Sequence, residues 1–206
     1  MTILSRIFLV LSGYLEKESE MINWLENFKY ALDNVRCKKN GVDSSFLKTA
    51  QKTKALFKKA EKRKASIFWV ANGGSAAICS HLSQDMVNKL GIKSYHFNDS
   101  SLITCMANDY GYENVYARPL KVHASKNDIL IAISSSGNSK NILNAVKVAK
   151  KKNMKVITLS GLNENNKLWA TPCLVSFFVS SDFYGIVEVC HETILHSIIE
   201  TLKRGG

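Results

Sequence analysis

Long hydrophobic runs and extended polar tracts are both absent from this sequence of 206 residues. No uninterrupted apolar stretch reaches the ~18 residues of a membrane-spanning helix, so we expect no contact with a membrane. Charged residues make up 22% of the chain and hydrophobic residues 46%, a balance that excludes intrinsic disorder. A chain of this length can bury a full core without disulfides, so we expect one structural unit.

Paired cysteine motifs are also missing. The five cysteines are odd in number, lie far apart and include no C-x-x-C. This pattern indicates reduced thiols in a cytoplasmic protein, most of them small core residues. The mildly apolar start, Met1–Tyr14, is followed by no small-residue cleavage site, and we interpret it as an amphipathic helix rather than a signal peptide.

Basic residues exceed acidic residues, and the formal net charge is +11. Such a charge favours anionic partners, among them nucleic acids and phosphorylated metabolites. The lysines gather in Lys48–Lys64 and Lys147–Lys155, where aromatic side chains suited to stacking on bases are almost absent. We therefore interpret both segments as solvated helix faces and do not expect nucleic-acid binding.

Residues 1–64 predict a helical extension that packs on the rest of the chain and on neighbouring subunits. Apolar residues recur at helical spacing in two segments, which Asn40-Gly41 separates. Asp43, Ser44 and Ser45 offer N-caps for the second helix. The periodic positions are Ile22, Leu25, Phe28 and Leu32 in the first segment, and Phe46, Ala50, Phe57 and Ala60 in the second.

Residues 65–206 alternate between short apolar runs and helical stretches. Nearly continuous apolar strands separated by helices indicate a parallel sheet covered on both faces. Five such strands predict an α/β fold with a flavodoxin-like, doubly wound sheet. The expected strands are Ile67–Val70, Ser94–Phe97, Ile129–Ile133, Val156–Leu159 and Leu174–Val179, and the expected helices are Ala76–Leu90, Tyr112–Ala124, Asn141–Lys151 and Val187–Lys203.

A serine-rich loop, Ser134–Ser139, directly follows the third expected strand. It lies before a helix, so free backbone N–H groups and the helix dipole favour an anion there. Capping the helix needs only one hydroxyl, whereas this loop has four serines. The Gly-Lys-Ser/Thr ending of a nucleoside triphosphate loop is absent, so we expect a phosphomonoester and no nucleotide cofactor.

A second glycine loop, Asn72-Gly73-Gly74-Ser75, follows the first expected strand. Taken alone it is consistent with a simple turn. Paired with the serine loop, it can form the other wall of one crevice, where its amides and Asn72 would hold sugar hydroxyls.

Two histidines and two carboxylates form a plausible set of metal ligands. His81 and Asp85 lie one turn apart on one expected helix, and Glu188 and His196 lie on another. These ligand types suit zinc. Spacing alone does not bring the two helices together, and the alternatives are a surface His81 and a core His196.

Three segments together resemble the SIS (sugar isomerase) domain family: Asn72–Ser75, Ala107–Gly111 and Ser134–Ser139. Within it, the chain is similar to the phosphoheptose isomerases, which convert sedoheptulose 7-phosphate to D-glycero-D-manno-heptose 7-phosphate. The resemblance covers most of the chain. It implies an aldose–ketose isomerase that acts through an enediol, forms a homotetramer and has sites between subunits.

The resemblance also implies roles for individual residues. Asp85, where the family usually has Glu, is the base, and His196 is the acid. One Zn²⁺ per subunit is implied at His81, Asp85, Glu188 and His196. Substrate binding is implied for Asn72, Gly73, Gly74, Ser75, Asn108, Asp109, Ser134, Ser135, Ser136, Ser139 and Glu188, the last replacing the family's usual Gln. The competing hypothesis is a non-catalytic sugar-phosphate sensor or protein-binding scaffold.

Overall fold

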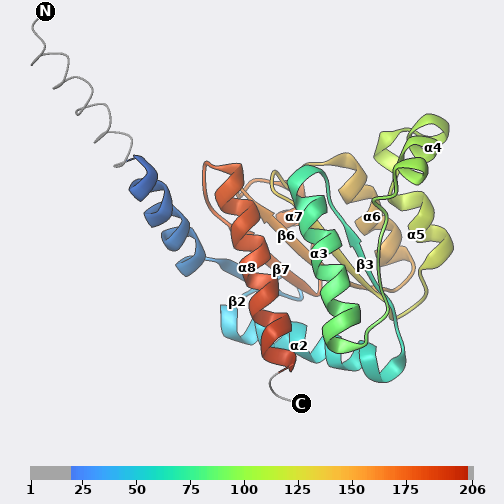
Figure 1. The fold of residues 1–206 in the computed structure, drawn as a ribbon, viewed down its shortest axis with the longest axis horizontal. Helices are drawn as coiled ribbons and strands as arrows, with labels where there is room; N and C mark the ends of the chain where they lie inside the picture. The colour runs from blue at the N-terminus through green and yellow to red at the C-terminus, as the bar shows by residue number, and fades with distance from the viewer. Residues whose placement is uncertain (1–19, 204–206) are drawn as a thin grey trace, which may run out of the picture.

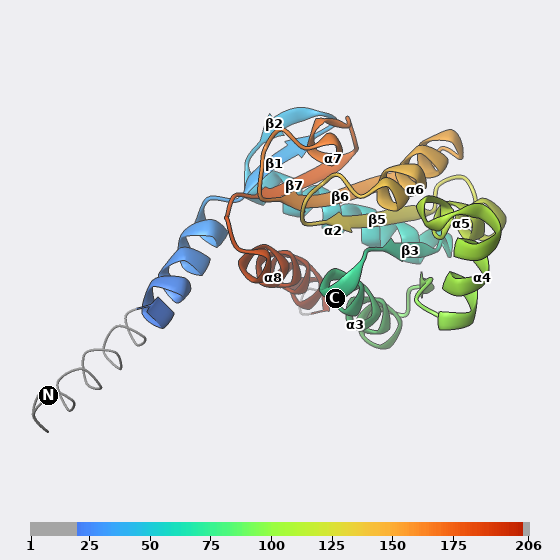
Figure 2. The ribbon, with the colours of Figure 1, turned by 90° about the horizontal axis from the view of Figure 1, so that it is seen from above.

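The computed structural model describes residues 20–203, so the expected helix at Met1–Tyr14 lies outside the described residues. A twisted sheet occupies the middle of the molecule, and helices cover both of its faces (Figures 1 and 2). No helix in the part of the chain described here is long and apolar enough to cross a membrane.

The sheet has seven strands in the order β2-β1-β7-β6-β5-β3-β4. The five from β3 onward pair in parallel, and when they are numbered 1 to 5 along the chain, their order across the sheet is the flavodoxin-like 2-1-3-4-5. The doubly wound parallel sheet expected from the sequence is therefore confirmed. These five strands are β3 (Ile67–Val70), β4 (Ser94–His96), β5 (Ile129–Ser134), β6 (Lys155–Gly161) and β7 (Val175–Val179).

A β-hairpin adds two strands that the sequence analysis did not predict, so the expected count of five was wrong. Strands β1 (Arg36–Lys39) and β2 (Val42–Ser44) are antiparallel, and β1 also pairs with β7. Asn40 and Gly41 form the turn with φ angles of 54° and 81°. Two left-handed residues produce the tight turn of a hairpin, so Asn40-Gly41 reverses a strand instead of separating two helices.

The helices match the expected ones except between β4 and β5 and before β7. Helix α4 lies between β4 and β5 and helix α7 lies before β7, and neither was expected. The single helix expected at Tyr112–Ala124 is two elements, the short 3₁₀ helix η1 and the α-helix α5. Ser45 caps α2, as the sequence suggested, by accepting a hydrogen bond from the backbone N–H of Lys48. Residues 20–33 are helical, followed by α2 (Phe46–Arg63), α3 (Gly73–Leu90), α4 (Ser100–Tyr110), η1 (Tyr112–Asn114), α5 (Ala117–His123), α6 (Lys140–Lys151), α7 (Lys167–Ala170) and α8 (Tyr184–Lys203).

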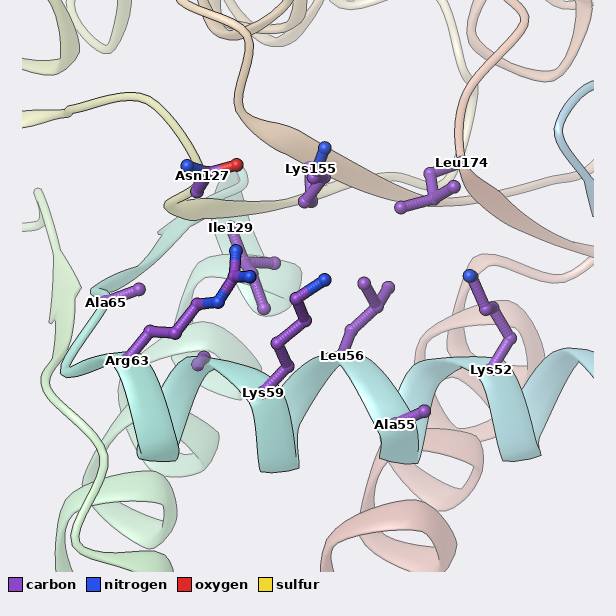
Figure 3. A pocket seen from close by; sticks show the side chains of 11 residues that line it. Lys52, Ala55, Leu56, Lys59, Arg63, Ala65, Asn127, Ile129, Lys155 and Leu174 are labelled. Atoms are coloured by element: carbon purple, nitrogen blue, oxygen red, sulfur yellow. The ribbon is translucent and has the colours of Figure 1, made fainter.

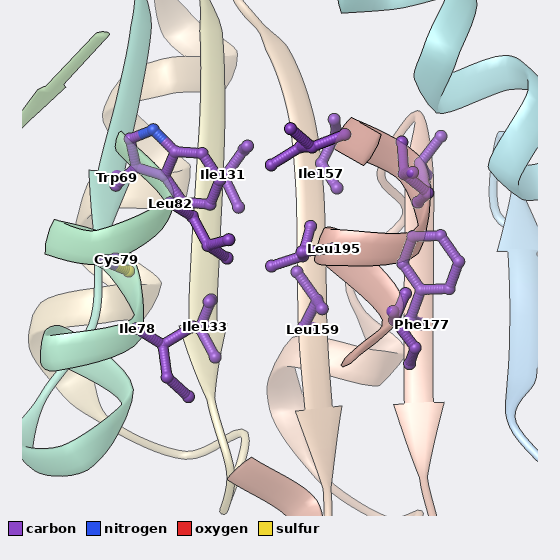
Figure 4. Close-up of a cluster of buried hydrophobic side chains, with 14 of the residues drawn as sticks. Trp69, Ile78, Cys79, Leu82, Ile131, Ile133, Ile157, Leu159, Phe177 and Leu195 are labelled. Carbon is purple, nitrogen blue, oxygen red and sulfur yellow. The ribbon is translucent and has the colours of Figure 1, made fainter. Parts of the chain in front are cut away.

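Alternating residues of the buried strands build two cores, one on each face of the sheet. In β5, Ile131 and Ile133 face the core shared with α3 and α8, whereas Leu130 and Ala132 face the core shared with α5 and α6. Figure 4 shows Leu82 of α3 and other side chains packed against the face of the sheet that α3 and α8 cover. This packing places α3 beside α8.

Candidate functional site

The two predicted loops meet where the order of the parallel strands reverses. Strands β3 and β5 are neighbours, although β4 comes between them in the chain. Asn72–Ser75 follows β3 at the start of α3, and the serine loop, Ser134–Ser139, follows β5 at the start of α6. Open α/β sheets bind ligands at such a switch point. We call the space between these two loops the crevice.

Hydrogen bonds join the two walls of the crevice. Asn72 and Asn141 exchange a pair of amide hydrogen bonds of 3.0 and 2.7 Å. The hydroxyl oxygens of Ser75 and Ser135 lie 3.5 Å apart. The Asn72 amide therefore holds the start of α6, a contact that sequence reasoning missed because Asn141 lies 69 positions away.

The serine loop is a tight turn with several hydroxyls close together. Gly137, at φ 64°, donates its backbone N–H to the carbonyl oxygen of Ser134 over 2.8 Å. Ser134 and Ser135 are buried, and the Ser134 hydroxyl donates to that of Ser139 over 3.2 Å. The cavity here has a volume of about 160 Å³. It is lined by Asn72, Ser75, Ile133, Ser134, Ser135, Ser136, Ser139, Tyr184 and Glu188.

Helix α7 supports the serine loop from behind. The backbone N–H of Leu168 donates to the carbonyl oxygen of Gly137 over 2.9 Å. Asn166 caps α7 by accepting from the N–H of Trp169, and a Cβ on Gly137 would lie only 1.9 Å from the Asn166 side-chain oxygen. Only glycine therefore fits at position 137. Asn166, a residue type common at helix N-caps, was a sequence signal for α7 that our prediction did not use.

Helices α3 and α8 lie side by side and run in the same direction. Polar side chains of the two helices meet at successive turns, leading away from the crevice. We call this row of contacts the polar ladder. It consists of Ser75 with Glu188, His81 with Glu192, Asp85 with His196, and Lys89 with Glu200.

His81, Glu192 and His196 form one part of the ladder. A Glu192 carboxylate oxygen lies 3.3 Å from Nδ1 of His81 and 3.7 Å from Nε2 of His196. The two imidazole rings meet edge to face, with centroids 5.0 Å apart. The structure thus brings together the two histidines from different helices, as the ligand hypothesis required.

Asp85 is almost fully buried, at 3% exposure, and lies next to His196. A carboxylate oxygen of Asp85 is 3.7 Å from Nδ1 of His196 and 2.8 Å from the ammonium nitrogen of Lys89. Lys89 also pairs with Glu200, and these two carboxylates raise the pKa of Lys89. His196 and Asp85, the candidate acid and base, are therefore adjacent, and Lys89 holds the carboxylate of Asp85 in place.

Glu188 lies at the crevice end of the ladder, apart from the histidines. Its carboxylate accepts a hydrogen bond from the Ser75 hydroxyl over 3.3 Å. A Cβ on Gly74 would lie 2.7 Å from a Glu188 oxygen, so the glycine makes room for this carboxylate. Two groups in the described part of the chain have ligand atoms within 4.8 Å of one another: His81, Glu192 and His196, and Asp85, His196 and Glu200.

Asn108 and Asp109 lie on α4, outside the crevice of the same chain. Both are exposed, and the Asn108 amide donates to Asp109 over 2.9 Å. Figures 1 and 2 show α4 at the edge of the molecule, away from α8. The structure therefore does not bring these two predicted site residues to the serine loop of their own chain.

The remaining histidines and cysteines are separate from this constellation. His191 is fully buried, its Nε2 lies 3.0 Å from the carbonyl oxygen of Ser160, and burial lowers its pKa to about 4. It therefore remains neutral as a core residue. All five cysteines are free, and all but Cys105 are buried.

Comparison with known proteins gives consistent matches. Residues 40–161 match the sequence model of the SIS domain family. Phosphoheptose isomerase of Cytophaga hutchinsonii is 32% identical over 176 residues, which are 80% of this chain and 92% of the relative. That of Histophilus somni is 37% identical over 162 residues, 76% of this chain and 83% of the relative. The phosphoheptose isomerase structure from Neisseria gonorrhoeae superposes with a TM-score of 0.79 at 23% identity, covering 91% of this chain and 98% of that one.

Proposed function

This chain belongs to the SIS domain family, among its phosphoheptose isomerases, and on that premise we propose that it interconverts a ketose and an aldose phosphate. The substrate is sedoheptulose 7-phosphate, the product is D-glycero-D-manno-heptose 7-phosphate, and the reaction proceeds through an enediol. The observation that carries this proposal is the serine-lined crevice at the switch point of the sheet.

The crevice is suited to a single phosphate group. Helices α3 and α6 both begin there, so their unpaired N–H groups and the positive ends of their dipoles favour an anion. The hydroxyls of Ser134, Ser136 and Ser139 supply further hydrogen-bond donors. Anchored in this way, the substrate keeps its reacting carbons in a fixed position, which lowers the entropic part of the barrier.

The polar ladder supplies the acid and base. Isomerisation moves a proton between C1 and C2, which needs a base beside those carbons and an acid at the carbonyl oxygen. Asp85 takes a proton from C1 while His196 gives one to the carbonyl oxygen on C2, which forms the enediol. Asp85 then returns its proton to C2, and His196 takes the proton from the hydroxyl on C1, which leaves the aldose. Burial of Asp85 keeps bulk water from competing for the proton.

A divalent metal, most simply Zn²⁺ at one per subunit, fits the donors gathered here. Of the predicted set, His196 lies near His81 in one group of possible ligands and near Asp85 in the other, and Glu192 is positioned beside both histidines. Glu188, the fourth predicted ligand, would reach a metal only from a neighbouring subunit. A bound Zn²⁺ would polarise the carbonyl and hydroxyl oxygens of the sugar.

We infer from the distance along α3 that a complete site needs two subunits. Asp85 lies ten positions beyond Ser75, which on an α-helix is about 15 Å. An extended seven-carbon sugar reaches only about 10 Å, given C–C bonds of about 1.5 Å. A sugar phosphate in the crevice would therefore react at the polar ladder of a neighbouring subunit.

Exposed apolar side chains support assembly into a homo-oligomer, which we take to be a tetramer. Met21, Ile22 and Leu25 are 64%, 55% and 55% exposed on the helix of residues 20–33. Both overall views show this helix projecting from the rest of the molecule (Figures 1 and 2). Neighbouring subunits would cover this face, because a single chain leaves it in water.

The decisive experiment is incubation with a panel of phosphorylated ketoses of five, six and seven carbons, followed by detection of the aldose. We expect the fastest turnover with sedoheptulose 7-phosphate. In the same assay, Ser134→Ala with Ser136→Ala should weaken sugar-phosphate binding, because each lost hydrogen bond to a charged group costs roughly 1.5–3 kcal/mol.

Two outcomes of this experiment would contradict the proposal. Tight binding of the sugar phosphate without turnover would make the protein a sensor or a scaffold. An unchanged affinity in the folded double variant would place the phosphate outside the serine loop.

A further inference from the structure

A second cavity, here called the basic pocket, lies at the amino ends of the parallel strands, whereas the crevice lies at their carboxyl ends. Its volume is about 400 Å³, and it lies between α2 and the first residues of β5 and β6. In Figure 3, Lys52, Lys59 and Arg63 extend from α2 toward Ile129 and Lys155 at the start of these strands. Strand β5 runs from Ile129 in this pocket to Ser134 in the crevice, so the two cavities are separate.

Four cationic side chains surround the basic pocket, and no acidic residue lines it. Lys52, Lys59 and Arg63 share one face of α2, because seven and four positions separate them. Lys155 lines the pocket from β6. Among the described residues, none of the four forms an ion pair.

Like charges at this spacing repel one another, and an anion bound between them would relieve that repulsion. The sequence pattern suggests a solvated helix face for Lys48–Lys64, and Lys59 and Arg63 are exposed, yet their side chains line a cavity beside the first residues of β5 and β6. Cations around a concave, low-dielectric surface focus their field into the cavity and attract a multiply charged anion.

The floor of the pocket is apolar, which narrows the class of ligand. Leu56, Ala60 and Leu174 line it together with Ile129. Inorganic phosphate would leave this surface exposed to water, whereas a flat or apolar group attached to the phosphates would cover it. The volume lies within the range of about 300–1,000 Å³ that is typical of small-molecule sites.

We propose that the basic pocket binds an organic polyphosphate with a planar or apolar body, of the nucleoside di- or triphosphate class. The lack of a Gly-Lys-Ser/Thr loop excludes such a ligand from the crevice but not from this pocket. Here the phosphates meet side chains of α2 and β6 instead of a helix N-terminus, and the base covers the apolar floor.

The test uses the full-length protein and the fluorescent N-methylanthraniloyl derivative of ATP as the probe. The paired variant Lys59→Gln with Arg63→Gln removes two charges from the pocket. The matched control, Lys58→Gln with Lys62→Gln, removes two exposed charges of the same helix that do not line it. Circular dichroism and thermal melting establish that both variants are folded.

We expect the pocket variant to bind the probe at least about tenfold more weakly, because two charge-assisted contacts are lost. The control should stay within about threefold of the wild type, because Lys58 and Lys62 do not line the pocket and lose no direct contact with the phosphates. ATP should displace the probe at lower concentration than tripolyphosphate or adenosine does.

Equal losses in the two variants would overturn the proposal, because they would show only general attraction to a basic protein. Displacement by tripolyphosphate as effective as by ATP would overturn the role of the apolar floor. Tighter binding of longer oligonucleotides would assign the surface to nucleic acid instead. Loss of probe binding in Ser134→Ala with Ser136→Ala would place the probe in the crevice. None of these measurements depends on isomerase turnover, so the two proposals can fail separately.

Discussion

Replacing Gly137 with alanine is expected to damage the serine loop through two separate effects. Gly137 has a φ angle of 64°, where a side chain costs about 1–2 kcal/mol. The new Cβ would also lie 1.9 Å from the side-chain oxygen of Asn166, far inside van der Waals contact. Asn166 must move, and its hydrogen bond to the N–H of Trp169 breaks.

Gly91 provides a matched control for the backbone effect alone. It has the same φ angle of 64°, at the end of α3, and apart from its chain neighbours and the backbone of its own helix, no atom lies within 4 Å of an added Cβ. Gly91→Ala should therefore lower the free energy of unfolding by only about 1–2 kcal/mol. Gly137→Ala adds the lost cap and the cost of overpacking, for a total of about 3–6 kcal/mol.

Urea unfolding followed by circular dichroism measures both free energies, and a change in tryptophan fluorescence, to which Trp169 contributes, reports on the displaced cap. Any Gly137→Ala protein that folds should also bind the sugar phosphate more weakly, because the loop no longer holds its turn. Equal destabilisation in the Gly91 and Gly137 variants would refute the reasoning, since the close approach of Asn166 would then cost nothing.

The remaining predictions concern the polar ladder and the assembly. Asp85→Asn and His196→Ala should each lower kcat by about 10²–10⁴-fold while phosphate affinity stays near that of the wild type, as measured by steady-state kinetics and calorimetry. Wild-type turnover in both variants would show that Asp85 and His196 do not act as the base and the acid. Glu192→Gln should weaken zinc binding more than Glu188→Gln does in metal titrations of the chelator-treated protein, and the reverse order would favour Glu188 as the ligand. Leu25→Asp should reduce the oligomer mass measured by light scattering, together with turnover, because the proposed site is shared between two subunits.

Local sequence patterns predicted most of the scaffold. Apolar runs marked β5 and β6, and the serines after β5 marked the loop at the carboxyl end of that strand. These features depend on residues near one another in the chain, because periodicity and turn chemistry act over a few positions. The hairpin at Asn40-Gly41 carried a local signal as well, but the flanking helical pattern outweighed it.

Contacts between distant segments depended on the tertiary structure alone. The sequence placed His81 and His196 on two helices, but only the order of the strands brings α3 beside α8. The same packing adds Glu192 and Lys89 to the constellation and places Glu188 beside Ser75. The tertiary structure also places a basic stripe of α2 beside a cavity. Helix periodicity determines which side chains share a face, whereas the burial of that face against the sheet determines which other helix they meet.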